Sequence, residues 1–196
     1  DEQGYFWDLM SLSFSENTLD MTDFNYSLPT SHSYRITVID EEKPNAYASI
    51  WGRIMISRWL LEDLSSQDEL FFILAHEIAH IENRDPLRAL LTNAPFTLSL
   101  ALLGFDASLP VSELNQAFLR YTSRETEREA DAFAVELLQD MGGNILCATQ
   151  FFENYASTSE KYTEFFSTHP VSQERITFLE SQALPEGPAA RGLLHT

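Results

Sequence analysis

The segment FFILAHEIAH, residues 71–80, constrains this chain more than any other feature. Most of its residues suit a buried helix, yet it contains His76, Glu77 and His80. Histidines four positions apart on a helix project from one face, where both rings can bind one metal ion. Burying such polar groups without partners would cost on the order of several kcal/mol. The segment therefore predicts a metal site.

The pattern H-E-x-x-H is the signature of zinc hydrolases, in which the glutamate acts as general base. We therefore expect His76 and His80 to bind one Zn²⁺ per chain, with Glu77 as the catalytic base. The alternative is that these histidines are satisfied core residues. The chain has only five histidines, and two of them lie here at ligand spacing around a glutamate. This coincidence favours the metal site.

A catalytic zinc usually takes three protein ligands, so a third donor must come from elsewhere in the chain. A histidine six residues after His80 would continue one known zinc motif, but that position is Pro86. The best donor lies in SRETEREADAFAVELL, where Glu127 and Asp131 are four apart. One can bind zinc, and the other can accept a hydrogen bond from a ligand histidine. The alternative is a solvated face with helical ion pairs, which better explains the neighbouring glutamates.

Composition narrows the possible partners of the chain. Its 196 residues suit one domain, and a formal net charge of −18 repels phosphate backbones and anionic membranes. We therefore expect polypeptide partners and no nucleic acid; the alternative is that the charge only maintains solubility. The longest apolar run, near FTLSLALLGF, is about half the length of a spanning helix, so an integral membrane protein is not expected.

Local patterns predict an α+β fold that is mostly α, with a small β-sheet beside the helix that carries His76. Strands are expected at 34–40 and 46–57, the second with a turn or bulge at Gly52. Helices are expected at 58–64, from Ser66 to Pro86, from about Ser112 to Met141, at 144–158 and after Pro170. We expect a domain at 34–184, an N-terminal segment, 1–33, packed on or near it, and a loose tail, 185–196.

Four segments together resemble one family: LAHEIAH, SRETEREADAFA, STHPVSQERI and the upstream PNAYASIWGRIMISRWLLEDL. They are similar to the zinc metallopeptidases grouped with the heat-shock protease HtpX and the CAAX prenyl protease. The resemblance covers about residues 43–180. It implies a gluzincin, a thermolysin-like metallopeptidase domain. STHP followed by ERI points to the soluble BepA-like and LoiP-like branch, here without its repeat domain.

The resemblance implies a role for each site residue. Zinc would be bound by His76, His80 and Glu127, and Glu77 would be the base. Asp131 would orient a ligand histidine, and Arg175 would support Asp131 or the nearby loop. His169 would stabilise the oxyanion or bind zinc as a fourth ligand in a resting form; the alternative is an ordinary loop histidine. A strand edge made by Ala46, Tyr47, Ala48 and Ser49 would hold extended substrate. Trp51 stands where the family usually has a Pro-Gly-Gly turn.

The function expected from these features is a zinc-dependent endopeptidase that cleaves unfolded or misassembled proteins. The resemblance places it in the periplasm or cell envelope, as a mature chain after a removed signal. The alternative is a latent or weakly active module that binds zinc in a closed site and acts as a chaperone or binding protein.

Overall fold

A computed structural model of the chain describes residues 18–20, 34–49, 51–93, 123–156 and 162–183. The predicted tail, 185–196, lies outside these residues, as does all of the predicted N-terminal segment except 18–20. Within the described residues, no helix combines the length and the apolar character needed to cross a membrane.

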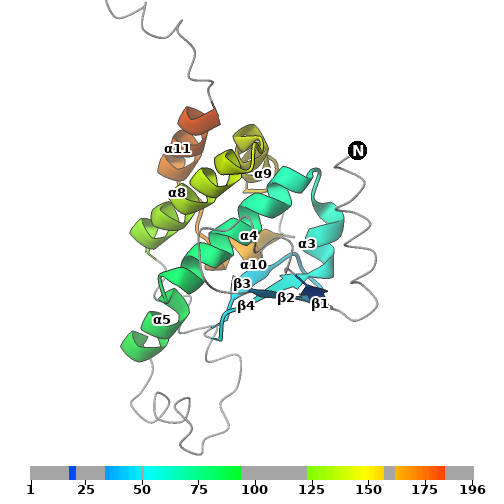
Figure 1. Ribbon diagram of the computed structural model, residues 1–196, viewed down its shortest axis with the longest axis vertical. Helices are drawn as coiled ribbons and strands as arrows, with labels where there is room; N and C mark the ends of the chain where they lie inside the picture. The colour runs from blue at the N-terminus through cyan, green and yellow to red at the C-terminus, as the bar shows by residue number, and fades with distance from the viewer. Residues whose placement is uncertain (1–17, 21–33, 50, 94–122, 157–161, 184–196) are drawn as a thin grey trace, which may run out of the picture.

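The described residues form helices packed on one four-stranded sheet (Figure 1). The strands lie in the order β1 (Thr18–Asp20), β2 (Arg35–Ile39), β4 (Arg53–Ser57) and β3 (Ala46–Ala48). β2 and β4 are parallel, while β1 pairs with β2 and β3 pairs with β4 in antiparallel fashion. Among the described strands, β3 is therefore an edge. This architecture confirms the predicted, mostly helical α+β fold with a small sheet.

The predicted strand 46–57 is wrong as a single strand, because the chain reverses within it. β3 and β4 form a hairpin, in which Ala46 lies opposite Ile56. The N–H of Gly52 donates to the carbonyl of Ser49 at 3.1 Å, and Gly52 has a φ of 72°. Glycine adopts this left-handed conformation without a steric penalty. Gly52 therefore closes a turn, which is one of the two alternatives predicted for this position.

Helix α4 (Gln67–Glu82) begins as predicted. The Ser66 hydroxyl accepts a hydrogen bond from the N–H of Glu69 at 3.1 Å. In return, the Glu69 carboxylate accepts from the N–H of Ser65 at 2.6 Å. The bond to Ser66 satisfies an N–H group that the first helical turn leaves unpaired.

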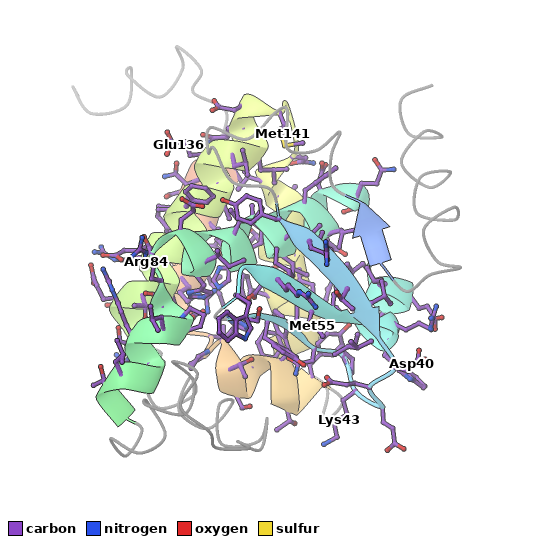
Figure 2. The ribbon with its side chains drawn as sticks, turned by 60° about the horizontal axis from the view of Figure 1, so that its bottom comes forward. Asp40, Lys43, Met55, Arg84, Glu136 and Met141 are labelled. Atoms are coloured by element: carbon purple, nitrogen blue, oxygen red, sulfur yellow. The ribbon has the colours of Figure 1, made fainter. Side chains whose placement is uncertain are left out.

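The predicted continuation of this helix to Pro86 is wrong. Arg84, labelled in Figure 2, has a φ of 57°, and this left-handed residue separates α4 from α5 (Asp85–Asn93). Pro86 lies in the first turn of α5, where a missing N–H costs nothing. The break therefore precedes the proline, and it places Asp85 at the start of a new helix.

Helix α8 (Arg124–Asp140) also begins later than predicted. Ser123 has an extended backbone and forms a reciprocal capping box with Thr126, so no helix runs continuously through it. The earlier part of the predicted helix, from Ser112 to residue 122, lies outside the described residues. The capping box orients the helix end that carries Glu127.

The remaining helices are α3 (Arg58–Asp63), α9 (Ile145–Ala156), α10 (Thr163–Thr168) and α11 (Gln173–Ala183). α10 was not predicted, and α11 begins three residues after Pro170. α4 lies between the sheet and the helices α8 and α9 (Figure 1). Its apolar residues complete a core that includes Ile36, Ile54, Ile56, Phe72, Ile78, Leu138 and Phe151.

Candidate metal centre

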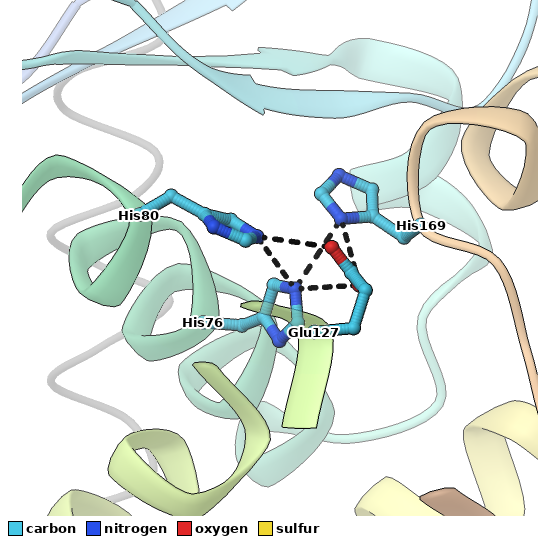
Figure 3. Close-up of side chains that lie close together, drawn as sticks. All are labelled: His76, His80, Glu127 and His169. Atoms are coloured by element: carbon cyan, nitrogen blue, oxygen red, sulfur yellow. Dashed lines mark hydrogen bonds and ion pairs between the residues drawn. The ribbon is translucent and has the colours of Figure 1, made fainter. Parts of the chain in front are cut away.

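Four buried side chains converge beside α4 (Figure 3). His76 and His80 lie one turn apart on α4, with their Nε2 atoms 3.1 Å from each other. Glu127 of α8 places Oε2 3.3 Å from Nε2 of His76 and Oε1 3.3 Å from Nε2 of His80. Nδ1 of His169, just after α10, lies 3.3 Å from Nε2 of His76 and 3.4 Å from Oε2 of Glu127.

The chemistry and spacing of these donors fit a zinc ion. Three imidazole nitrogens and a carboxylate oxygen are among the ligands that zinc prefers. Donors placed tetrahedrally at zinc's usual bond lengths are about 3.3–3.4 Å apart. Five of the six donor pairs here are separated by 3.1–3.4 Å, and all four donors lie within 4.8 Å of one another. Neither oxygen of Glu127 accepts a hydrogen bond of good geometry within the described residues. The site thus offers buried lone pairs to a cation.

Asp131 and Arg175 orient the ring of His76. Nδ1 of His76 lies 3.0 Å from Oδ1 of Asp131, and an ionised carboxylate can only accept, so Nδ1–H donates. This tautomer leaves the lone pair of Nε2 directed at the cluster. Arg175 donates to both oxygens of Asp131, at 2.6 and 2.7 Å. Its Nη1 also lies 2.8 Å from Oε2 of Glu127, so one guanidinium links both α8 carboxylates.

Asp85 holds the second histidine and was not among the predicted site residues. Nδ1–H of His80 donates to Oδ2 of Asp85 at 2.9 Å, which again directs the lone pair of Nε2 at the cluster. Asp85 is buried and begins α5. The signal in the sequence was an aspartate directly before Pro86, five residues after the second histidine of the motif.

Glu77 lies beside the cluster and is fully buried. Neither of its carboxylate oxygens accepts a hydrogen bond of good geometry within the described residues. Nε2 of His169 lies 3.2 Å from Oε1 of Glu77 and 3.3 Å from the carbonyl oxygen of Ala46. A buried carboxylate without such bonds is costly for the folded state, which makes Glu77 a candidate functional group.

Aromatic contacts hold His169 at this position. The ring of Phe165, in α10, lies 5.5 Å from that of Phe151 and 5.1 Å from that of His169, between centroids. Tyr162, just before α10, also contacts Phe151, at 6.1 Å. The short helix α10 is thus packed on α9, and the residue that follows it faces the cluster.

The electrostatic field of the centre favours positive charge. Burial alone would lower the pKa of His80, but Asp85 and Glu127 raise it to about 10. Burial would raise the pKa of Glu127, but His169 and His76 hold it well below its usual range. A proton or a metal cation is therefore stabilised at this point, and the two compete.

The residues predicted to hold substrate lie at the sheet edge. Ala46, Tyr47 and Ala48 form β3, and Ser49 follows in the hairpin turn. Both alanines are buried as whole residues, backbone included. Because the Ala46 carbonyl is next to His169, this edge begins at the centre itself.

Comparison with known proteins identifies the family. The family model described as Peptidase family M48 matches residues 16–183. The chain belongs to peptidase family M48. This confirms the resemblance to the HtpX-type metallopeptidases and the prediction of a metallopeptidase.

Relatives of this M48 chain include three named proteases. The beta-barrel assembly-enhancing protease of Escherichia coli O157:H7 is 24% identical over 185 residues, which cover 85% of this chain and 38% of that protein. The mitochondrial metalloendopeptidase OMA1 of Arabidopsis thaliana is 29% identical over 157 residues, 76% of this chain and 32% of that protein. The protease HtpX homolog of Salinibacter ruber is 28% identical over 190 residues, 76% of this chain and 68% of that protein. The chain thus spans about a third of the first two relatives.

Proposed function

We propose that this chain is a zinc-dependent endopeptidase that hydrolyses unfolded or misassembled proteins in the bacterial cell envelope. The observation that carries the proposal is the cluster of His76, His80, Glu127 and His169 beside the buried Glu77. Its spacing suits zinc, and M48 members are peptidases. The relative named a beta-barrel assembly-enhancing protease supports a protein substrate and an envelope location.

In this proposal His76, His80 and Glu127 bind zinc. When bound, zinc supplies Lewis-acid activation of a water molecule and of the scissile carbonyl. Glu77 takes the proton of the attacking water on a carboxylate oxygen and later gives it to the leaving amine. Its burial keeps bulk water away from that proton.

Asp131 and Asp85 have positioning roles in the proposal. Each accepts the Nδ1 proton of one ligand histidine, at 3.0 and 2.9 Å. A histidine held in one tautomer and one orientation is a better ligand, because its lone pair need not be reorganised on binding. Arg175 holds Asp131 in turn through two hydrogen bonds.

A closed, latent site is the second candidate, and the position of His169 favours it. Nδ1 of His169 lies with the proposed ligands, while Nε2 lies against Glu77 and the Ala46 carbonyl. A tetrahedral site with four protein donors is typical of structural zinc. A substrate would have to displace this ring, which could then donate to the oxyanion from its displaced position.

Digestion of casein by the zinc-loaded chain and its His169→Ala variant separates these functions. Faster cleavage by the variant indicates latency, and slower cleavage with zinc retained indicates oxyanion support. If neither form cleaves casein although both bind zinc tightly, the proposed peptidase function is contradicted. The second candidate, a closed zinc-binding module, then remains. Zinc content, measured by elemental analysis on the same samples, shows whether each form is loaded.

A further inference from the structure

The β3 side of the β3–β4 hairpin is a sheet edge that has no partner strand among the described residues. The N–H of Ser49 donates to the carbonyl of Arg53 at 2.7 Å, and the N–H of Ser57 donates to that of Asn45 at 2.8 Å. Backbone groups alternate in direction along a strand. Those of Ala46 and Ala48 therefore point away from β4, towards the edge that has no partner strand among the described residues.

This edge begins at the metal centre and ends at Trp51. The Ala46 carbonyl lies 3.3 Å from Nε2 of His169. At the other end of β3, the turn closed by Gly52 lies over the last turn of α4. A Cβ built on Gly52 would lie 3.9 Å from Cγ2 of Ile81, the residue after His80. An extended chain paired with β3 would thus pass from the centre to this turn.

Trp51 is the most exposed large apolar side chain among the described residues, with 71% of its surface accessible. An indole left in water forgoes the free energy of burial that tryptophan usually contributes. Trp51 lies in the turn that joins β3 to β4. Strands rise about 3.4 Å per residue, so Ser49 lies about 10 Å along the edge from Ala46. Trp51 therefore stands about three to four residues away from the centre, measured along a paired chain.

We propose that Trp51 determines specificity, by packing its indole on an aromatic or long aliphatic side chain of an extended polypeptide substrate. That side chain lies about three to four residues from the scissile bond. The inference rests on the proposed peptidase function, because it assigns a substrate preference to that site. Backbone pairing with β3 accepts many sequences, whereas contact with an indole selects apolar side chains.

A series of peptides with one phenylalanine moved along an otherwise small and polar sequence tests this preference. We expect the wild type to cleave the peptide with phenylalanine at the selected position about two- to tenfold more efficiently than its neighbours. Trp51→Ala should remove the preference by raising the KM of the favoured peptide while its kcat stays unchanged. Trp51→Phe should largely keep the preference. Trp59→Ala is the matched control, since Trp59 is also exposed but lies in α3, beyond the opposite end of the hairpin.

Binding of the same labelled peptides to zinc-loaded Glu77→Gln, followed by fluorescence anisotropy, gives a readout that does not need cleavage. The phenylalanine preference should appear in Kd and disappear when Trp51→Ala is added. An equal preference with and without Trp51, in cleavage or in binding, would overturn the inference and leave the peptidase standing. Absence of cleavage by every form would overturn the peptidase, while the binding series would still decide the role of Trp51.

Discussion

Each of the two α4 histidines donates a hydrogen bond to one aspartate, and the two aspartates differ in the hydrogen bonds that hold them in place. Both oxygens of Asp131 accept from Arg175. Asp85 accepts from His80 through Oδ2, while its buried Oδ1 has no hydrogen-bond partner within the described residues. The orientation of His80 therefore depends on a single carboxylate that is less supported than its counterpart.

Replacement of Asp85 by alanine should weaken zinc binding about 10- to 100-fold, because His80 loses the partner that fixes its ring. Asp85→Asn should weaken it less, since the amide oxygen still accepts from Nδ1–H. Competition with a chelating dye measures both affinities. Zinc affinity equal to the wild type in Asp85→Ala would show that His80 needs no such partner.

The carboxylate of Glu77 is proposed to act as the general base rather than to position a ligand. Glu77→Gln keeps the volume of the side chain but cannot take a proton, so it should retain zinc and lose about 10²- to 10⁴-fold in kcat. Peptide hydrolysis and zinc content are measured on the same preparation. Substantial turnover by this variant would remove the assignment of Glu77 as base.

The residues brought together here were partly predictable. His76 and His80 follow from helix spacing, and Glu77 follows from the H-E-x-x-H pattern. Glu127 with Asp131 follows from a second helix face and the family resemblance. Asp85 was missed because its contact with His80 depends on the chain reversal at Arg84, a left-handed residue that the sequence pattern does not mark. A proline at position 86 indicated that the helix would stop, but not where.

At the scale of elements, the start of α8 determines where Glu127 lies. The Ser123 side chain caps this helix, four residues before Glu127, through the N–H of Thr126. Other element boundaries were predicted less well for a common reason. The hairpin turn and the short helix α10 depend on contacts with α4 and α9, which local propensity does not contain.

Removal of the cap by Ser123→Ala should lower the free energy of unfolding by about 1 kcal/mol, because an N–H of the first helical turn loses its acceptor. Ser123→Asp is the matched control, since aspartate also caps helices and suits the N-terminal end of the helix dipole. Urea unfolding of the zinc-loaded proteins measures the difference. Equal stability of wild type and Ser123→Ala would mean that packing alone fixes the start of α8.

At the scale of the whole molecule, the centre joins elements that are distant in the sequence. α4 supplies two histidines and the proposed base, α8 supplies Glu127, and the end of α10 supplies His169. Such a set of donors exists only in the folded chain, so metal binding stabilises the fold. In a chain with a net charge of −18, a divalent cation also relieves repulsion among buried acidic groups.

Zinc removal with a chelator should therefore lower Tm, and zinc added back should restore it. At a thousandfold excess over Kd the ligand contributes about 4 kcal/mol, which corresponds to a shift on the order of 10 °C for a chain of this size. Calorimetry at fixed pH measures the shift. An unchanged Tm would indicate that the centre is preformed and does not bind zinc.

Zinc stoichiometry of the wild type, Glu127→Ala and Glu125→Ala tests the central claim most directly. Glu125 is the matched control, because it lies on the same helix, is exposed and pairs with Arg128. The account predicts about one zinc per chain in the wild type and in Glu125→Ala, and a large loss in Glu127→Ala. Full zinc retention by Glu127→Ala, or no zinc in the wild type after loading, would contradict a centre built from α4 and α8.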